Sequence, residues 1–300
     1  MEQQKCNTLS QPYKKRLKKN FSEEQDNEKV LISAEGKHQV EVTSRNPKPL
    51  DYNYGHQLGN FPNYYNFNPP SERLDLLQVE FYCKLLKLQE YNNGKFLICD
   101  IGCNEGDLSV LFMEKLVEAS QLLQKEFEEG KGTAPDEFHL LGIDIDELLI
   151  KRAGEKHLNH SMSKNLHFHS QDICENGNTV LTDFLSSQGE ESFHIISCFS
   201  TTMWIHINYG DEGLRRFLRQ ISSLTNNVII EPQPWKCYRN ARQRLRRLKL
   251  PPAPHIDSLE MKHNVPELIK EFLLSTECGF ASAESIGKTK WDREVWLFKK

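Results

Sequence analysis

The stretch Phe96–Asp107, with the sequence FLICDIGCNEGD, decides the fold of this chain. Its first four residues are apolar without polar alternation, which is typical of a parallel strand buried on both faces. Gly102 and Gly106 then let the backbone turn tightly and pass close to a ligand. Apolar residues follow at helical spacing from Leu108, so the turn opens a helix whose free amide groups point back toward it. The stretch therefore predicts a strand, a ligand-binding loop and a helix.

The charge of this loop separates two classes of cofactor. A dinucleotide-binding fold uses G-x-G-x-x-G to bring its backbone against a pyrophosphate, but Asn104 replaces the second glycine here. Asp100, Glu105 and Asp107 make the loop acidic. That charge disfavours a pyrophosphate and suits the sulfonium and amino groups of S-adenosylmethionine. On this stretch alone, a glycine turn that binds nothing is the alternative.

Two more stretches end in acid in the same way. Phe138–Asp146, FHLLGIDID, predicts a second buried strand, and an acid at the position of Asp144 accepts hydrogen bonds from both ribose hydroxyls in nucleoside-binding sheets. Leu166–Asp172 predicts a third strand, with Asp172 at its tip as an acceptor for an adenine amino group. These strands and the helices between them indicate a doubly wound α/β sheet that binds ligands at the carboxyl ends of its strands.

Other elements follow from the same patterns. We expect a helix that starts near Ser71, with Ser71 as its cap and Leu74, Leu77, Phe81, Leu85 and Leu88 as its buried stripe. The polar stretch 121–136 is interpreted as a surface insertion. Further strands are predicted at 193–199, 227–231, 281–286 and 295–298, and further helices at 178–186, 211–221, 236–249 and 265–276.

Composition limits the compartment and the number of domains. The chain has 300 residues, of which 38% are hydrophobic, enough for one substantial core. Residues 1–55 hold few large apolar side chains and predict a disordered tail, so the folded domain is expected at 56–300. The sequence shows neither an apolar run long enough to span a bilayer nor a secretory leader. We therefore predict a cytosolic or nuclear protein without a membrane partner.

Neither cysteine nor histidine patterns indicate a metal site. The eight cysteines lack any C-x-x-C spacing and are interpreted as reduced and mostly buried. His157, His160, His167 and His169 straddle the end of a predicted helix and a predicted strand, and no carboxylate or cysteine completes a set. We predict no metal.

Basic residues concentrate in two places although the formal net charge is −4. One cluster lies at 14–19, and the other runs from Lys236 to Lys249 with seven Lys or Arg and no acidic residue. In the predicted helix 236–249, Arg239, Arg242 and Arg246 share one face. An apolar stripe of Ala241, Leu245 and Leu248 faces the domain. This pattern indicates a local surface for a polyanion such as RNA.

The segments DIGCNEGDLS, GIDID, TTMWIHINYGDEGL and IIEPQPWKCYRNARQRL occur in this order. With them, the chain resembles the bicoid-interacting-3 domain family of RNA 5'-phosphate methyltransferases. WIHINYGDEGL followed by EPQPW is the most diagnostic part, and GNFPNYYNFNPPSERL resembles the family's entry segment, so the resemblance covers about residues 58–300. It implies a Rossmann-like class I S-adenosylmethionine-dependent methyltransferase fold, with a seven-stranded, mostly parallel sheet whose last strand is antiparallel.

The resemblance also implies site residues. Arg73 and Asn104 would lie at the methionine end of the cofactor, Asp144 at the ribose, Asp172 with Ile173 at the adenine, and Phe199 would contact it through its backbone. Asp100 and Gly102 complete the cofactor-binding set. No catalytic residue is assigned with certainty, and the candidates for positioning the terminal phosphate are His206, Asn208, Lys236, Tyr238 and Arg239.

The short form of the chain is most similar to the cytoplasmic branch of the family. That branch monomethylates RNA 5'-monophosphates, with histidine tRNA and microRNA precursors as substrates, and we expect a monomer. The other branch carries Tyr-Arg-Asn-Pro after its entry tyrosines, whereas Asn66–Pro69 here contain no arginine, so its mode of phosphate binding is not implied. Two alternatives stay open: an RNA-binding scaffold that keeps the fold without turnover, and a methyltransferase for small molecules or proteins.

Overall fold

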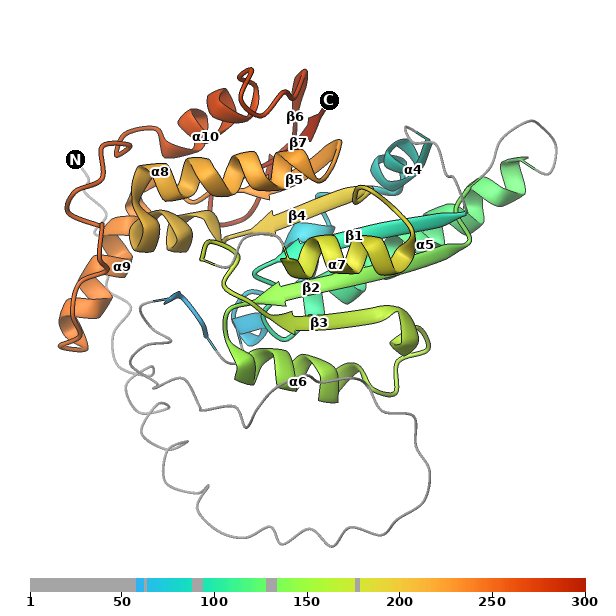
Figure 1. Ribbon diagram of the computed structural model, residues 1–300, viewed down its shortest axis with the longest axis horizontal. Helices are drawn as coiled ribbons and strands as arrows, with labels where there is room; N and C mark the ends of the chain where they lie inside the picture. The colour runs from blue at the N-terminus through green and yellow to red at the C-terminus, as the bar shows by residue number, and fades with distance from the viewer. Residues whose placement is uncertain (1–57, 62–63, 88–93, 128–133, 176–178) are drawn as a thin grey trace, which may run out of the picture. The chain divides into compact units, whose positions relative to one another are not determined.

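The computed structural model describes residues 58–61, 64–87, 94–127, 134–175 and 179–300. The predicted tail at 1–55 lies outside these residues. Within them the chain forms one sheet with helices on both faces (Figure 1).

The sheet has seven strands in the order β3-β2-β1-β4-β5-β7-β6. Five of them run parallel, and β7 runs antiparallel to both of its neighbours, β5 and β6. This arrangement confirms the predicted class I methyltransferase fold. The bounds are β1 Lys95–Ile101, β2 Glu137–Asp144, β3 Leu166–Ser170, β4 Ile195–Phe199, β5 Asn227–Glu231, β6 Ser282–Lys288 and β7 Glu294–Lys299.

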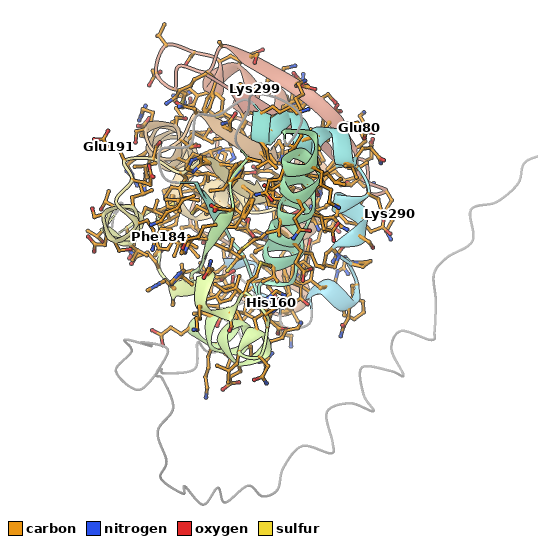
Figure 2. All side chains as sticks on the ribbon, turned by 90° about the vertical axis from the view of Figure 1, so that its right-hand side faces the viewer. Glu80, His160, Phe184, Glu191, Lys290 and Lys299 are labelled. Carbon is orange, nitrogen blue, oxygen red and sulfur yellow. The ribbon has the colours of Figure 1, made fainter. Side chains whose placement is uncertain are left out.

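Two hydrophobic cores form, one on each face of the sheet. On one face lie α7 (Thr179–Gln188), α8 (Thr202–Ser223), α9 (Trp235–Arg247) and α10 (Val265–Leu273). On the other lie α3 (Ser71–Leu74), α4 (Val79–Lys87) and α5 (Asp107–Phe127), and α4 and α5 are side by side in Figure 2. Helix α6 (Glu147–His157) lies beside β3, and the short 3₁₀ helices η1 and η2 span Tyr64–Asn66 and Ser163–Asn165.

The parallel strands β2, β3 and β4 all point their carboxyl ends to the left in Figure 1. The loops that follow these strands, and the first turns of α6 and α8, gather at this edge. The order of the strands reverses between β1 and β4, where the connections leave toward opposite sides of the sheet. Ligands of doubly wound sheets bind at such a point.

The predicted helix at Ser71 is divided in the structure. It forms α3 and α4, separated by residues 75–78. Pro70 occupies the cap position and makes no side-chain capping bond, so the prediction that Ser71 caps the helix is wrong. Leu74, Leu77 and Leu85 are buried as predicted, and Leu88 lies outside the described residues.

Other helices also differ from the predicted bounds, and three of these differences concern the site or the predicted surface. Helix α8 begins at Thr202, well before the predicted 211, and continues across Gly210, whose φ of 73° breaks the helical geometry. Helix α5 extends to Phe127 through part of the predicted polar insertion. Helix α9 ends at Arg247. Leu248 follows it with 43% of its surface exposed, so it does not join the predicted apolar stripe.

Candidate active site

The loop after β1 is held open by backbone geometry that glycine permits. Gly102 has φ of +80°, and a Cβ there would lie 2.2 Å from Oγ1 of Thr201. Its N–H donates to the carbonyl of Ile143 at 2.7 Å, which ties the loop to β2. Asn104 also has a positive φ, 54°, a conformation that Asn tolerates better than most residues. The loop is therefore fixed in a shape that brings its backbone close to the sheet edge.

Asp144 faces this loop from the end of β2. One carboxylate oxygen accepts from the backbone N–H of Asn104 at 2.9 Å and the other from that of Asp146 at 3.0 Å. Burial, partly offset by these two bonds, raises the pKa of Asp144 to about 6. Each carboxylate oxygen also keeps a lone pair for a further donor. Asp144 is thus set between the loop and the start of α6, as an acceptor for a ligand that bears hydroxyl groups.

Asp100 is turned into the fold at the end of β1. Its two oxygens accept from the hydroxyls of Ser109, at 2.5 Å, and Ser197, at 2.7 Å. Burial raises the pKa of Asp100 despite these bonds. The side chain therefore connects β1 to β4 and α5, and brings negative potential to the edge from within.

Asp172 follows the end of β3. One oxygen accepts from the backbone N–H of Cys174 at 2.9 Å, and the other bonds to the hydroxyl of Tyr209 on α8. Ile173 is buried in the core beside α7 and α8. Asp172 therefore stands between β3 and α8, and its bond to Tyr209 is an interaction that the sequence did not predict.

Residues Leu58–Phe61, at the start of the predicted entry segment, span the carboxyl edge. Asn60 donates to Asp146 at 3.4 Å, and the carbonyl of Phe61 accepts from the amide of Asn104 at 3.3 Å. Gly59 in the same segment packs against the Trp204 ring of α8, so closely that a Cβ on this residue would lie 2.2 Å from the ring. The segment thus joins the β1 and β2 loops to α8, as a cover over the site.

Arg73 is the most deeply buried cation at this edge, with 1% of its surface exposed. Its Nε donates to Glu231 at 2.6 Å, and its Nη2 donates to the hydroxyls of Tyr64 at 3.1 Å and Ser200 at 2.9 Å. Nη1 has no hydrogen-bond partner among the described residues. A buried donor without a partner is costly, so this atom marks a place for a ligand acceptor.

Sequence reasoning missed the residues around Arg73. Glu231, at the end of β5, is fully buried and also accepts from Trp291 Nε1 at 2.8 Å and Arg293 Nη1 at 3.2 Å. Ser200, with φ of 57°, accepts from Arg293 Nη1 at 2.5 Å. Glu231 ends β5 and Arg293 directly precedes β7, so the pairing of these two strands brings both to the same edge, and the local sequence pattern does not reveal that pairing.

The phosphate-positioning candidates separate into two groups. His206 is fully buried: its ring nitrogens bond to the Tyr238 hydroxyl and to Asp211, each at 2.9 Å. Tyr238 is 1% exposed and stacks on Trp235. Both side chains therefore lie inside the domain and join α8 to α9, so the structure does not support their predicted contact with phosphate. Lys236 and Arg239 are exposed.

Asn208, the remaining candidate, donates from its amide to the carbonyl of Trp204 at 2.8 Å. This bond runs back along α8, one turn toward its start.

Burial lowers the pKa of the other α8 candidate, His206, which keeps its ring neutral inside the domain.

The basic helix α9 presents only part of its predicted face. Arg242 forms an ion pair with Asp257 at 2.6 Å. Arg244 lies over the rings of Phe61, at 4.4 Å, and Trp204, at 5.3 Å, and burial lowers its pKa. Arg239 and Arg246 are exposed and belong to none of the ion pairs formed by the described residues. Of the predicted face, these two side chains are the ones left available to a polyanion, and Lys236 and Arg247 are further exposed cations of α9.

Three of the four histidines considered as ligands have separate partners. His157 lies 3.3 Å from the carbonyl oxygen of Glu105, His160 bonds to Glu114 at 2.9 Å, and His167 stacks against His139. In the part of the chain that the structure describes, no group of three or more His, Cys, Asp or Glu is placed to hold a metal ion. None of the helices there is long and apolar enough to cross a membrane.

The edge fits S-adenosylmethionine. The unpartnered Nη1 of Arg73 suits a carboxylate, and the carboxylate of Asp144 suits hydroxyl donors. Asp100 and Asp144 give the β1 and β2 side a negative character that suits a sulfonium. Asn104, Asp172, Ile173 and Phe199 line the same edge, and their contacts with the cofactor stay predictions.

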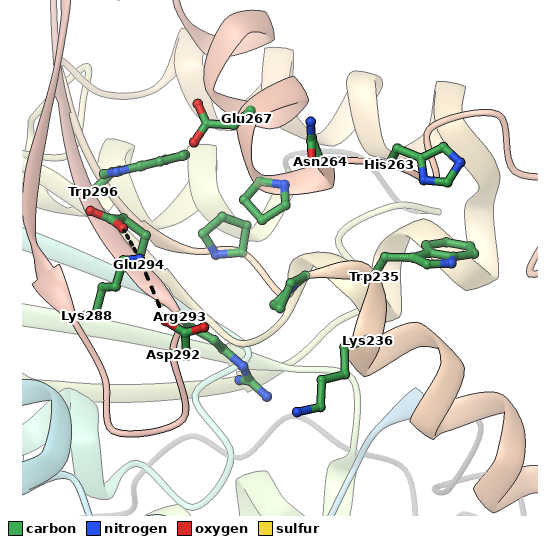
Figure 3. A pocket seen from close by; sticks show the side chains of 13 residues that line it. Trp235, Lys236, His263, Asn264, Glu267, Lys288, Asp292, Arg293, Glu294 and Trp296 are labelled. Carbon is green, nitrogen blue, oxygen red and sulfur yellow. Dashed lines mark ion pairs between the residues drawn. The ribbon is translucent and has the colours of Figure 1, made fainter.

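Arg73, Arg293 and the carboxylate of Glu231 that they share form an arginine cluster. A pocket of about 450 Å³ lies beside this cluster, between the start of α9, the start of α10 and the hairpin that joins β6 to β7 (Figure 3). Lys236 and Arg293 extend toward one another on one side of it. Trp235 and His263 stand on the other. The acids of its wall are paired with lysines: Asp292 and Glu294 share Lys288, 3.7 Å from each, and Glu267 lies 3.5 Å from Lys270.

Comparison with known proteins places the chain in a family. A family model described as bicoid-interacting protein 3 matches residues 193–300. The RNA 5'-monophosphate methyltransferase of Homo sapiens is 40% identical over 244 residues, 81% of this chain and 80% of that protein. The pre-miRNA 5'-monophosphate methyltransferase of Xenopus laevis is 37% identical over 246 residues, 80% of this chain and 91% of that protein. The chain belongs to the bicoid-interacting protein 3 family, and S-adenosylmethionine is its cofactor.

Proposed function

We propose that the protein transfers a methyl group from S-adenosylmethionine to the 5'-terminal phosphate of RNA. The observation that carries this proposal is the division of one sheet edge into an acidic side, at β1 to β3, and an arginine side, at β4, β5 and β7. A cationic methyl donor suits the first side, and an anionic acceptor suits the second. Relatives named RNA 5'-monophosphate methyltransferases support the same assignment.

The chemistry requires placement more than proton transfer. When bound, S-adenosylmethionine supplies a methyl group activated by the sulfonium. A phosphate monoester has a second pKa of about 6, so its terminal oxygens are already anionic at neutral pH. No side chain has to remove a proton, which agrees with the burial of His206 and Tyr238. The protein's own contribution is to hold the phosphate in line with the methyl group.

The finer substrate assignment rests on the relatives. Two of them are named pre-miRNA 5'-monophosphate methyltransferases, which supports our proposal of precursor microRNA as a substrate of this chain. Histidine tRNA is proposed as a second substrate on the family resemblance alone. We also propose that it acts in the cytoplasm, as a monomer. Methylation would cap the RNA end and reduce its charge.

A transfer assay tests the proposal. Labelled S-adenosylmethionine is incubated with one RNA that carries a 5'-monophosphate and with the same RNA after dephosphorylation. We expect transfer to the first RNA only. Equal transfer to both would indicate a methyltransferase for another position. Binding of the phosphorylated RNA without any transfer would support the non-catalytic scaffold.

A further inference from the structure

The arginine side of the edge has an excess of positive charge. Arg73 and Arg293 share one carboxylate, that of Glu231, which is fully buried. Their side chains are 1% and 19% exposed, so water neutralises this excess only weakly. Two guanidinium groups and one carboxylate leave one uncompensated positive charge. An anion is needed to balance it.

Several hydrogen-bond donors in the cluster lack a good acceptor. Among the described residues, Nη1 of Arg73 and Nε of Arg293 have no partner. Nη2 of Arg293 has only the Cys237 sulfur, at 3.6 Å, and a thiol is a weak acceptor. The Ser200 oxygen accepts from both arginines, which leaves its own proton for a further acceptor. The unmet donors and the excess charge thus call for the same kind of ligand.

Two anionic groups belong to the reaction, and the cluster offers a place for each. Arg73 lies over the Phe199 ring, 5.8 Å from its centroid, at the cofactor side of the cluster. Arg293 lines the pocket between α9, α10 and the β6–β7 hairpin, where it faces Lys236. Two cations that point toward one another repel unless an anion lies between them. Among the described residues, Lys236 forms no ion pair.

We infer that Arg293 binds the terminal phosphate of the RNA, together with Lys236, in this pocket. The inference rests on the proposed function and adds a residue that the sequence did not indicate. In this arrangement Arg73 serves the methionine carboxylate and Arg293 serves the phosphate. Glu231, shared by both, positions the two arginines. A bidentate guanidinium contact fixes the orientation of a phosphate as well as its charge.

The test compares Arg293→Gln with the wild-type protein in binding two forms of one RNA. The wild-type protein should bind RNA with a 5'-monophosphate more tightly than the same RNA with a 5'-hydroxyl. Arg293→Gln should reduce that preference by about 10- to 100-fold, the value of a charge-assisted bond. Affinity for S-adenosylmethionine and for the 5'-hydroxyl RNA should not change. Arg293→Lys should restore part of the preference, because it keeps the charge and loses the fork.

Glu231 keeps Arg73 and Trp291 in Arg293→Gln, so the variant should fold, and thermal unfolding checks that it does. If it melts early, Lys236→Gln, an exposed change on α9, tests the same pocket and should lower the preference as well. A full preference for the 5'-monophosphate in folded Arg293→Gln would overturn the inference alone. The absence of any preference or methyl transfer in the wild-type protein would instead overturn the proposed function.

Discussion

The two sides of the sheet edge satisfy their charged groups in opposite ways. On the β1 and β2 side, carboxylates are held by backbone N–H groups and serine hydroxyls, with Asp100 and Asp144 as the main examples. On the β4 and β5 side, one carboxylate, Glu231, is held by two arginines and an indole. On the first side Asp100 and Asp144 have only neutral donors, whereas Glu105 and Asp107 are paired with Arg152 and Lys156. The second side keeps an excess of positive charge. The two unpaired carboxylates suit the sulfonium of a methyl donor, and the positive excess suits a phosphate acceptor.

The topology explains why the two sides meet. β1 and β4 are paired, but their connections leave toward opposite sides of the sheet, and the loops on either side leave room for a ligand that reaches both. The antiparallel β7, inserted beside β5, brings the β6–β7 hairpin and Arg293 to an edge that is otherwise formed by parallel strands. The fold therefore places an arginine from the end of the chain next to one from its beginning.

The largest expected effect comes from Glu231→Gln, which removes the carboxylate that compensates Arg73. We expect the free energy of unfolding to fall by about 3 to 5 kcal/mol, the cost of leaving a buried charge unpaired. Urea unfolding measures it. Glu284→Gln is the matched control, because Glu284 also pairs with two cations, Lys84 and Lys299, but is 46% exposed. It should cost less than about 1 kcal/mol. Equal losses of stability in the two variants would show that burial of Glu231 does not make its ion pairs more important for stability than the exposed pairs of Glu284.

The acidic side is tested by Asp144→Ala. We expect it to weaken S-adenosylmethionine binding by about 1 to 3 kcal/mol, because the variant cannot accept charge-assisted hydrogen bonds from the ribose hydroxyls. Calorimetry measures the change, with Asp183→Ala on the exposed surface of α7 as the control. Unchanged affinity in Asp144→Ala would remove this residue from the ribose site.

The pH dependence of cofactor binding is a second test of Asp144 as the ribose acceptor. Burial raises the pKa of Asp144 from 3.8 to about 6, so the carboxylate is ionised above pH 6 and becomes protonated below it. Cofactor affinity should therefore fall as the pH drops through 6, approaching about tenfold per pH unit. The stability of the cofactor-free protein should change in the opposite sense, because protonation relieves the burial of a charge. Asp144→Asn should remove both steps, and steps that persist in this variant would belong to another group.

The smallest effect is expected on α9. Replacing Arg239 and Arg246 with Gln should weaken RNA binding a few-fold and lower the salt slope by about one unit for each phosphate that the variant no longer neutralises. Cofactor affinity should stay the same. Arg242→Gln is the control, since Arg242 is paired with Asp257. A double variant with an unchanged salt slope would place the RNA path elsewhere.

The predictable part of the site is the part that is local in sequence. An apolar run, an acid and a glycine turn at Phe96–Asp107 predicted the β1 strand and its loop, and the same pattern located Asp144. The arginine cluster was not predictable in this way, because its three residues are far apart in the chain. The pairing of β5 with β7 brings Glu231 and Arg293 together, and Arg73 reaches them from α3. Of the residues in this cluster, the family resemblance implied only Arg73.

His206 shows the opposite error. The predicted helix at 211–221 left His206 outside it, but α8 begins at Thr202, where Gln233 accepts from the backbone N–H of Met203 at 3.0 Å and caps the helix. The helix turns His206 inward, onto Tyr238 and Asp211. A side chain's direction depends on where its helix starts, and here a residue from another strand's loop sets that start.

The position of the transferred methyl group tests the central claim most directly. RNA with a 5'-monophosphate is methylated with labelled S-adenosylmethionine and digested to mononucleotides, which are separated and identified by mass. The division of the edge into acidic and arginine sides predicts that the label lies on the phosphate of the 5'-terminal nucleotide. Label on a base or a ribose would contradict it, because the arginine side would then be serving some purpose other than holding the acceptor phosphate.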